Sequence, residues 1–125
     1  MSQTENTAGS RHKVMICEDE FIVALDLKLM LEDFGFEVLG PFSEVSAASE
    51  FVKDTRPDVA LLDVNLRDGQ VFPLADTLAE KGVPMVFHSG HVDDSEIRER
   101  YPEAASCKKP VNTEGLKNAL FQSVA

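Results

Sequence analysis

The chain has 125 residues, a length that suggests one domain with a real hydrophobic core. It carries 22 acidic and 12 basic residues, for a net charge of -10, so neither nucleic acid nor an anionic membrane is an expected partner. No apolar stretch approaches the roughly 20 residues of a membrane span, and residues 1–12 lack the apolar core of a signal peptide. We therefore expect a disordered tail over residues 1–12, a folded domain over residues 13–125, and a soluble, cytoplasmic protein.

Apolar runs bounded by polar residues predict short strands at 14–17, 37–40, 58–63, 83–88 and 104–108. Apolar residues at helical spacing predict helices at about 21–34, 44–53, 70–80, 93–100 and 113–123. Gly35 stands where the left-handed residue that ends a helix is expected, while Ser43 and Asn112 are the expected caps of two helices. The helix at 93–100 has only Ile97 as an apolar anchor, so it should be the weakest.

Strands that alternate with helices over short connections indicate an α/β fold. We expect a doubly wound, five-stranded parallel sheet with helices on both faces and the flavodoxin-like strand order 2-1-3-4-5. In this order the first and third strands are neighbours. Glu18 and Asp19, after the first strand, should therefore meet Asp63, at the end of the third.

This acidic group predicts a metal site. Three adjacent carboxylates repel one another, so they must be protonated or share a cation. Oxygen ligands at an open, hydrated edge suit Mg²⁺, which Glu18, Asp19 and Asp63 could bind together with the main-chain carbonyl of Asn65.

Two further groups should reach the same edge and favour phosphoryl transfer. Ser89, at the end of the fourth strand, offers a hydroxyl, and Lys109, beyond the fifth, offers an ammonium. A carboxylate can accept a phosphoryl group when a metal ion and a cation neutralise its oxygens. Asp63 is therefore the expected nucleophile; Lys109 is favoured over Lys108 because it directly precedes Pro110.

From Lys13 onwards the sequence resembles the receiver domains of two-component response regulators. The matching segments, in the family's order and spacing, are Ile16-Cys17-Glu18-Asp19-Glu20, Leu61-Leu62-Asp63-Val64-Asn65, Ser89 and Lys109-Pro110. The resemblance implies that Asp63 accepts a phosphoryl group from a sensor histidine kinase, with Glu18 and Asp19 as metal carboxylates, Ser89 as the switch hydroxyl and Lys109 as the paired lysine. It also implies a bond before Pro110 that is usually cis.

The implied function is that of a single-domain response regulator without a DNA-binding output domain. Such a protein is a phospho-acceptor rather than an enzyme, with Mg²⁺-dependent self-phosphorylation and slow autodephosphorylation. It would signal through protein–protein contacts or act as a phosphate sink.

Residues 84–91 resemble the Pro-Phe-x-Phe-Ala-Thr-Gly-Tyr motif of an α-proteobacterial receiver subfamily, which implies a kinase of the HWE type. Met85, His88, Ser89 and His91 replace the motif's Phe, Ala, Thr and Tyr. The two histidines could suggest a transition-metal site or a proton relay, but they lack a third ligand at suitable spacing. We interpret His88 as a packing residue at the strand end and His91 as a half-exposed polar residue.

The route by which a signal leaves the site should be unusual. Ser106 stands three residues before Lys109, where ordinary receivers carry a Tyr or Phe that turns inward. The expected route is therefore the loop at Gly90-His91 and the helix that follows it.

The first helix carries a second apolar stripe besides its core face. Ile22, Leu25 and Leu29 form this stripe, and exposed apolar stripes often mark partner surfaces. We expect it to contact the helical bundle of the kinase; packing under loops and self-association are the alternatives.

Two other functions use similar residues. A Mg²⁺-dependent phosphatase that forms an aspartyl phosphate should carry an Asp-x-Asp motif, and Asp63-Val64-Asn65 lacks the second acid. A pseudo-receiver that only binds partners would not need the full set of acids, hydroxyl and lysine.

Overall fold

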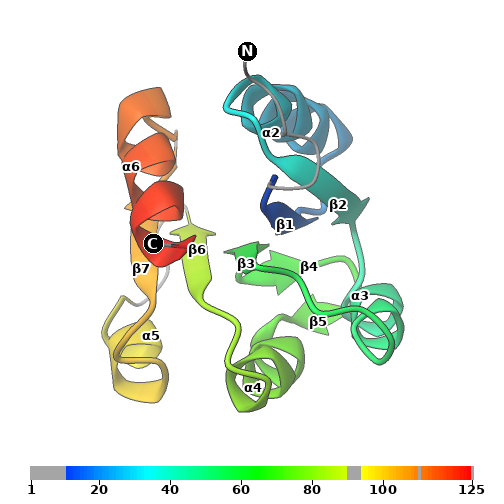
Figure 1. Cartoon of the computed structure of the whole chain (residues 1–125). Helices are drawn as coiled ribbons and strands as arrows, with labels where there is room; N and C mark the ends of the chain where they lie inside the picture. The colour runs from blue at the N-terminus through cyan, green and yellow to red at the C-terminus, as the bar shows by residue number, and fades with distance from the viewer. Residues whose placement is uncertain (1–10, 90–93, 110, 125) are drawn as a thin grey trace.

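The computed structural model describes residues 11–89, 94–109 and 111–124. One sheet contains β1 (Lys13–Cys17), β2 (Glu37–Phe42), β3 (Val59–Asp63), β6 (Met85–Ser89) and β7 (Ala105–Lys108). Its order is β2-β1-β3-β6-β7 with parallel neighbours, which confirms the predicted topology (Figure 1). The predicted tail up to residue 10, the loop at Gly90-His91 and the bond before Pro110 lie outside the described residues.

Helices cover both faces of the sheet (Figure 1). One face carries α2 (Phe21–Asp33) and α6 (Thr113–Val124), and the other carries α3 (Val45–Phe51), α4 (Phe72–Glu80) and α5 (Asp94–Arg100). None of these described helices combines the length and apolar character that crossing a membrane requires.

Alternating side chains along each central strand enter two separate cores. In β1, Val14 and Ile16 pack with Leu27 and Leu31 of α2, whereas Met15 belongs to the cluster under α3, α4 and α5. The same alternation runs through β3, where every residue is buried. A slip of one residue would exchange these two sets, so burial fixes the register and aligns the carboxyl ends of β1 and β3.

Gly35 ends α2 as predicted. Its φ is 102°, a left-handed conformation that a residue with a Cβ rarely adopts. The Gly35 N–H donates to the Glu32 carbonyl at 3.0 Å, and the Phe36 N–H donates to the Leu31 carbonyl at 3.1 Å. These bonds satisfy carbonyls at the end of the helix and direct Phe36 into the core.

The segment after β3 is more ordered than the loop that the sequence predicts. β4 (Asn65–Leu66) and β5 (Gly69–Gln70) form an antiparallel hairpin, and α4 consequently starts at Phe72 rather than at residue 70. Asp68, at the hairpin tip, accepts hydrogen bonds from the N–H groups of Val45 (2.6 Å) and Ser46 (3.1 Å). Asp68 thus caps α3, and the prediction that Ser43 provides this cap is wrong.

α5 has a second anchor that sequence periodicity missed. Ile97 is buried as expected, and so is Tyr101, directly after the helix. The Tyr101 ring stacks on Phe87 with centroids 5.5 Å apart, and its hydroxyl donates to Asp76 Oδ1 at 2.6 Å. These contacts fasten the end of α5 to β6 and α4.

Replacing Asp68 with alanine should lower the thermal stability at pH 7, because two N–H groups at the start of α3 lose their acceptor. The bond from the Val45 N–H is the main cause that holds the pKa of Asp68 below its ordinary value of 3.8. A carboxyl with a lowered pKa in the folded state stabilises the fold above its unfolded pKa, and this contribution is lost as the pH falls through the folded pKa.

Thermal unfolding of both proteins from pH 7 downwards should therefore show a difference in Tm that narrows in acid. Ser43→Ala is the matched control and should leave the Tm nearly unchanged. A difference between wild type and Asp68→Ala that did not vary with pH would contradict the capping role.

Candidate functional site

Three carboxylates meet at the carboxyl edge of the sheet. Glu18 and Asp19 directly follow β1, and Asp63 is the last residue of β3. Because Cys17 pairs with Leu62 across these neighbouring strands, each side chain offers an oxygen within 4.8 Å of the other two. The structure thus brings together the three acids that the strand order predicts at this edge.

Lys109 joins two of these acids. Its Nζ lies 2.8 Å from Asp63 Oδ2 and 3.2 Å from Glu18 Oε1. The Glu18 side chain is 0% exposed and that of Asp63 is 9% exposed. Removing one partner from such a buried ion pair typically costs about 3–5 kcal/mol, because the other charge stays buried without compensation.

The balance of burial and charge shifts the ionisation of this group. Burial raises the pKa of Glu18 to about 7, and the negative charge of Asp63 adds to the rise. A hydrogen bond from the Glu20 N–H to Glu18 Oε2 (3.1 Å) and the Lys109 ammonium oppose it. Burial lowers the pKa of Lys109, but its bonds to Asp63 and Glu18 outweigh this effect and raise the pKa overall, so the lysine stays charged.

His88 is buried, as expected for a packing residue at the strand end, but the sequence did not reveal that it lies beside the acidic group. Its side chain is 0% exposed, and Nε2 lies 3.7 Å from Glu18 Oε1, beyond hydrogen-bonding distance. Burial lowers the pKa of His88 to about 4 although the charge of Asp63 opposes the shift, so the ring is neutral at pH 7. The nearby Cys17 backbone also favours the protonated ring and so raises the pKa of His88, although neither ring nitrogen makes a hydrogen bond.

The remaining predicted site residues lie close by in the chain. The Asn65 N–H donates to Asp63 Oδ1 at 3.2 Å, so both oxygens of Asp63 have a donor. Ser89 is the last residue of β6 and pairs with Lys108; its side chain lies outside the described part of the structure.

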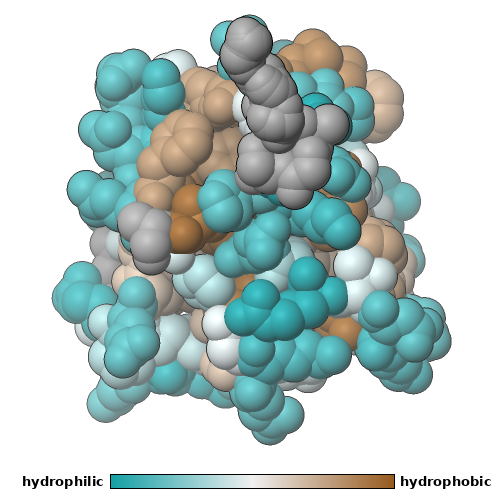
Figure 2. Space-filling model, viewed as in Figure 1, coloured by the Kyte–Doolittle hydropathy of each residue, from teal (hydrophilic) through white to brown (hydrophobic). Residues whose placement is uncertain are grey.

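The apolar stripe on α2 faces outward. Ile22 is 72% exposed, Leu25 43% and Leu29 55%, while Ala24, Leu27 and Leu31 form the buried face of the helix. Phe21, which the predicted stripe did not include, is 80% exposed. Figure 2 shows hydrophobic residues at the upper right of the molecule, over α2.

A groove of about 350 Å³ connects this face to the acidic edge. Glu18 and Asp19 line one part of it, and Phe21, Leu25 and Lys28 of α2 line another. A surface bound to α2 would therefore extend directly to Glu18 and Asp19.

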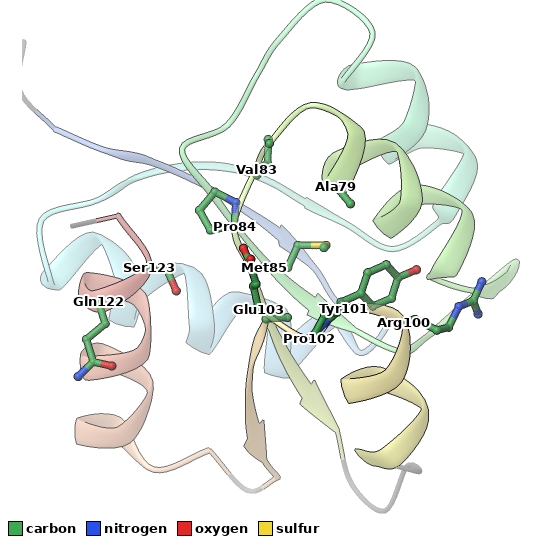
Figure 3. Close-up of a pocket in the computed structure, with 12 residues that line it drawn as sticks. Ala79, Val83, Pro84, Met85, Arg100, Tyr101, Pro102, Glu103, Gln122 and Ser123 are labelled. Atoms are coloured by element: carbon green, nitrogen blue, oxygen red, sulfur yellow. The ribbon is translucent and has the colours of Figure 1, made fainter.

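A larger cavity, of about 630 Å³, opens at the opposite, amino edge of the sheet (Figure 3). Its walls come from the start of β6, the chain after α5 and the end of α6, including Met85, Tyr101 and Gln122. It contains none of the three clustered acids, so it is separate from the candidate site.

Comparison with known protein families matches residues 14–121 to the response regulator receiver domain. The chain is 28% identical over 127 residues to the transcriptional regulatory protein PdtaR of Mycobacterium tuberculosis, covering 98% of this chain and 61% of PdtaR. It is 26% identical to the phyllosphere-induced regulator PhyR of Methylorubrum extorquens, covering 96% of this chain and 46% of PhyR. It thus spans less than two thirds of the length of these curated relatives.

The chain also resembles a solved structure over nearly the whole length of both proteins. SdrG from Sphingomonas melonis Fr1 matches with a TM-score of 0.77 and 33% sequence identity, covering 93% of this chain and 98% of that chain.

Replacing Asp63 with asparagine should lower the pKa of Glu18 from about 7 part of the way toward its ordinary value of 4.5. The variant removes a neighbouring negative charge and leaves Lys109 with Glu18 as its carboxylate partner. The chemical shift of the Glu18 carboxyl carbon, followed by NMR against pH in Mg²⁺-free buffer, measures this change. Asp68→Asn, at the hairpin tip, is the control; an unchanged pKa of Glu18 in Asp63→Asn would mean that the charge of Asp63 does not contribute to the shift.

Proposed function

Because the chain belongs to the response regulator receiver domain family, we propose that it accepts a phosphoryl group on Asp63 from a sensor histidine kinase. The observation that carries this proposal is the Lys109 ammonium, 2.8 Å from Asp63 Oδ2, beside three carboxylates at one edge of the sheet. Phosphorylation would change protein–protein contacts of the chain, with slow autodephosphorylation returning it to the starting state.

In the transfer step, an oxygen of Asp63 forms a bond to phosphorus while the bond from phosphorus to the kinase's histidine nitrogen breaks. The three oxygens of the phosphoryl group carry the negative charge of the transition state. Lys109 is already held beside Asp63 and supplies a positive charge to one of them. The Asn65 N–H, bonded to Oδ1, restricts rotation of the nucleophile. The Ser89 hydroxyl remains the predicted donor to another phosphoryl oxygen.

The donor set suits Mg²⁺. Glu18, Asp19 and Asp63 offer hard oxygen ligands within 4.8 Å of one another, and Mg²⁺ prefers a few carboxylates together with water. These three side chains would hold the ion, with the Asn65 carbonyl as the predicted additional ligand. When bound, it would neutralise negative charge on the phosphoryl oxygens.

The exposed face of α2 is the proposed docking surface for the helical bundle of the kinase. An apolar surface of this kind suits the side of an amphipathic helix, and its groove continues to the acidic edge where the phosphohistidine must arrive. Lys28 also lines this groove, with its ammonium paired to Glu32 Oε2 at 2.9 Å. That the kinase is of the HWE type rests on the resemblance of residues 84–91 alone.

Incubation with acetyl phosphate and Mg²⁺ should add the mass of one phosphoryl group to the intact chain. Asp63→Asn should gain none, and chelation of Mg²⁺ should prevent the reaction in the wild type. Lys109→Met should react at least roughly tenfold more slowly, because charge stabilisation is lost, whereas the neighbouring Lys108→Met serves as the control and should react normally. Phosphoryl mass on Asp63→Asn would disprove the assignment of the acceptor.

Leu29→Glu tests the docking surface, because Leu29 is exposed on α2 and does not line the groove at the acidic edge. Transfer from a purified HWE-type kinase that phosphorylates the wild type should slow roughly tenfold, since a charge would enter an apolar interface. Labelling by acetyl phosphate should not change. Equal transfer rates in both proteins would exclude this surface as the kinase-docking site. If the wild type were a dimer and Leu29→Glu a monomer, the surface would serve self-association instead.

A further inference from the structure

His88 is a buried polar side chain without a hydrogen-bond partner. Among the side-chain nitrogen and oxygen atoms of the described residues, the two ring nitrogens of His88 are the ones that are fully buried and make no hydrogen bond. Burying such a group without a partner costs free energy, and native proteins seldom contain one unless it has a role. The carboxylate of Glu18 is close by, with Oε1 3.7 Å from His88 Nε2.

The same oxygen of Glu18 has a competing partner. Glu18 Oε1 accepts a hydrogen bond from Lys109 Nζ at 3.2 Å, and Lys109 also binds Asp63 Oδ2. Under the proposed function, a phosphoryl group on Asp63 adds oxygens with negative charge beside this lysine. When Lys109 turns to them, Glu18 Oε1 loses its donor while its side chain is fully buried.

We infer that His88 is a positioning residue that donates its Nε2–H to Glu18 Oε1 when Lys109 moves to the phosphoryl group. This inference rests on the proposed function and deepens it. An approach of less than about 1 Å would bring the two atoms within hydrogen-bonding distance. His88 can follow events at the acceptor because its backbone pairs with that of Asp63 across β3 and β6.

His88 lies outside the group of side chains that could bind a metal ion together. The residues whose ligand atoms all lie within 4.8 Å of one another are Glu18, Asp19 and Asp63, and His88 is not among them. The ring nitrogen Nε2 lies 3.7 Å from Glu18 Oε1, where it can replace a hydrogen-bond donor to that oxygen.

NMR of the histidine rings in the ¹⁵N-labelled full chain tests the inference. The chain has three histidines, and loss of one set of signals in His88→Phe assigns His88. The probe is beryllofluoride with Mg²⁺, a mimic of the phosphoryl group. We expect an Nε2–H that exchanges slowly with water when both are present and not with Mg²⁺ alone. In Lys109→Met the same signal should appear without the mimic, because Glu18 already lacks its lysine donor.

Reaction rates provide a second readout. His88→Phe should react with acetyl phosphate roughly tenfold more slowly than the wild type, because Glu18 keeps competing for Lys109. His88→Gln, which keeps an N–H donor, should recover part of this loss at a similar Tm. His88→Ala is the alternative donor-free variant if His88→Phe does not fold.

Two results would overturn the inference while leaving the proposed function intact. One is that ¹⁹F NMR shows bound beryllofluoride while the signals of the His88 ring do not change, or that these signals already change with Mg²⁺ alone. The other is equal reaction rates in the Phe and Gln variants. If neither beryllofluoride nor a phosphoryl group attached to Asp63, the proposed function itself would be wrong, and the inference with it.

Discussion

The contact between Lys109 and the two buried carboxylates of Glu18 and Asp63 is the constraint on which the site depends. It joins residues that are 91 and 46 positions apart in the chain, and so it links the carboxyl ends of β1, β3 and β7. Two acids share one ammonium here in a region of low exposure, so any added negative charge must compete for the same lysine. Lys109 is therefore the group through which a change of charge at Asp63 would reach Glu18.

That contact exists because the sheet is buried on both sides. Residues of β1, β3 and β6 alternate between the core under α2 and α6 and the core under the other helices. This alternation leaves each strand no freedom of register, and the parallel order then places Glu18 and Asp63 side by side. Substitutions inside either core would act on the site through the alignment of these strand ends.

Much of this arrangement could be predicted because its determinants are local. Buried strands and the helix end at Gly35 depend on neighbours a few residues away, and the handedness of crossovers then leaves few strand orders. The cap of α3 could not be predicted in this way, because Asp68 lies 23 residues from the N–H of Val45. The burial of His88 agrees with its interpretation as a packing residue, but its approach to Glu18 could not be predicted, since a residue at a strand end gives no signal of which side chains the adjacent strands place beside it.

β6 contacts both the acidic group and the core on the other face of the sheet. His88 lies beside Glu18, while its neighbour Phe87 points into the opposite core and stacks on Tyr101. Tyr101 in turn donates its hydroxyl to Asp76 of α4. Because adjacent side chains of a strand share one backbone and cores are closely packed, a displacement of β6 that carried His88 toward Glu18 would also move Phe87 against Tyr101. The column of Phe87, Tyr101 and Asp76 thus connects the strand next to Asp63 with the surface of α4 and the end of α5.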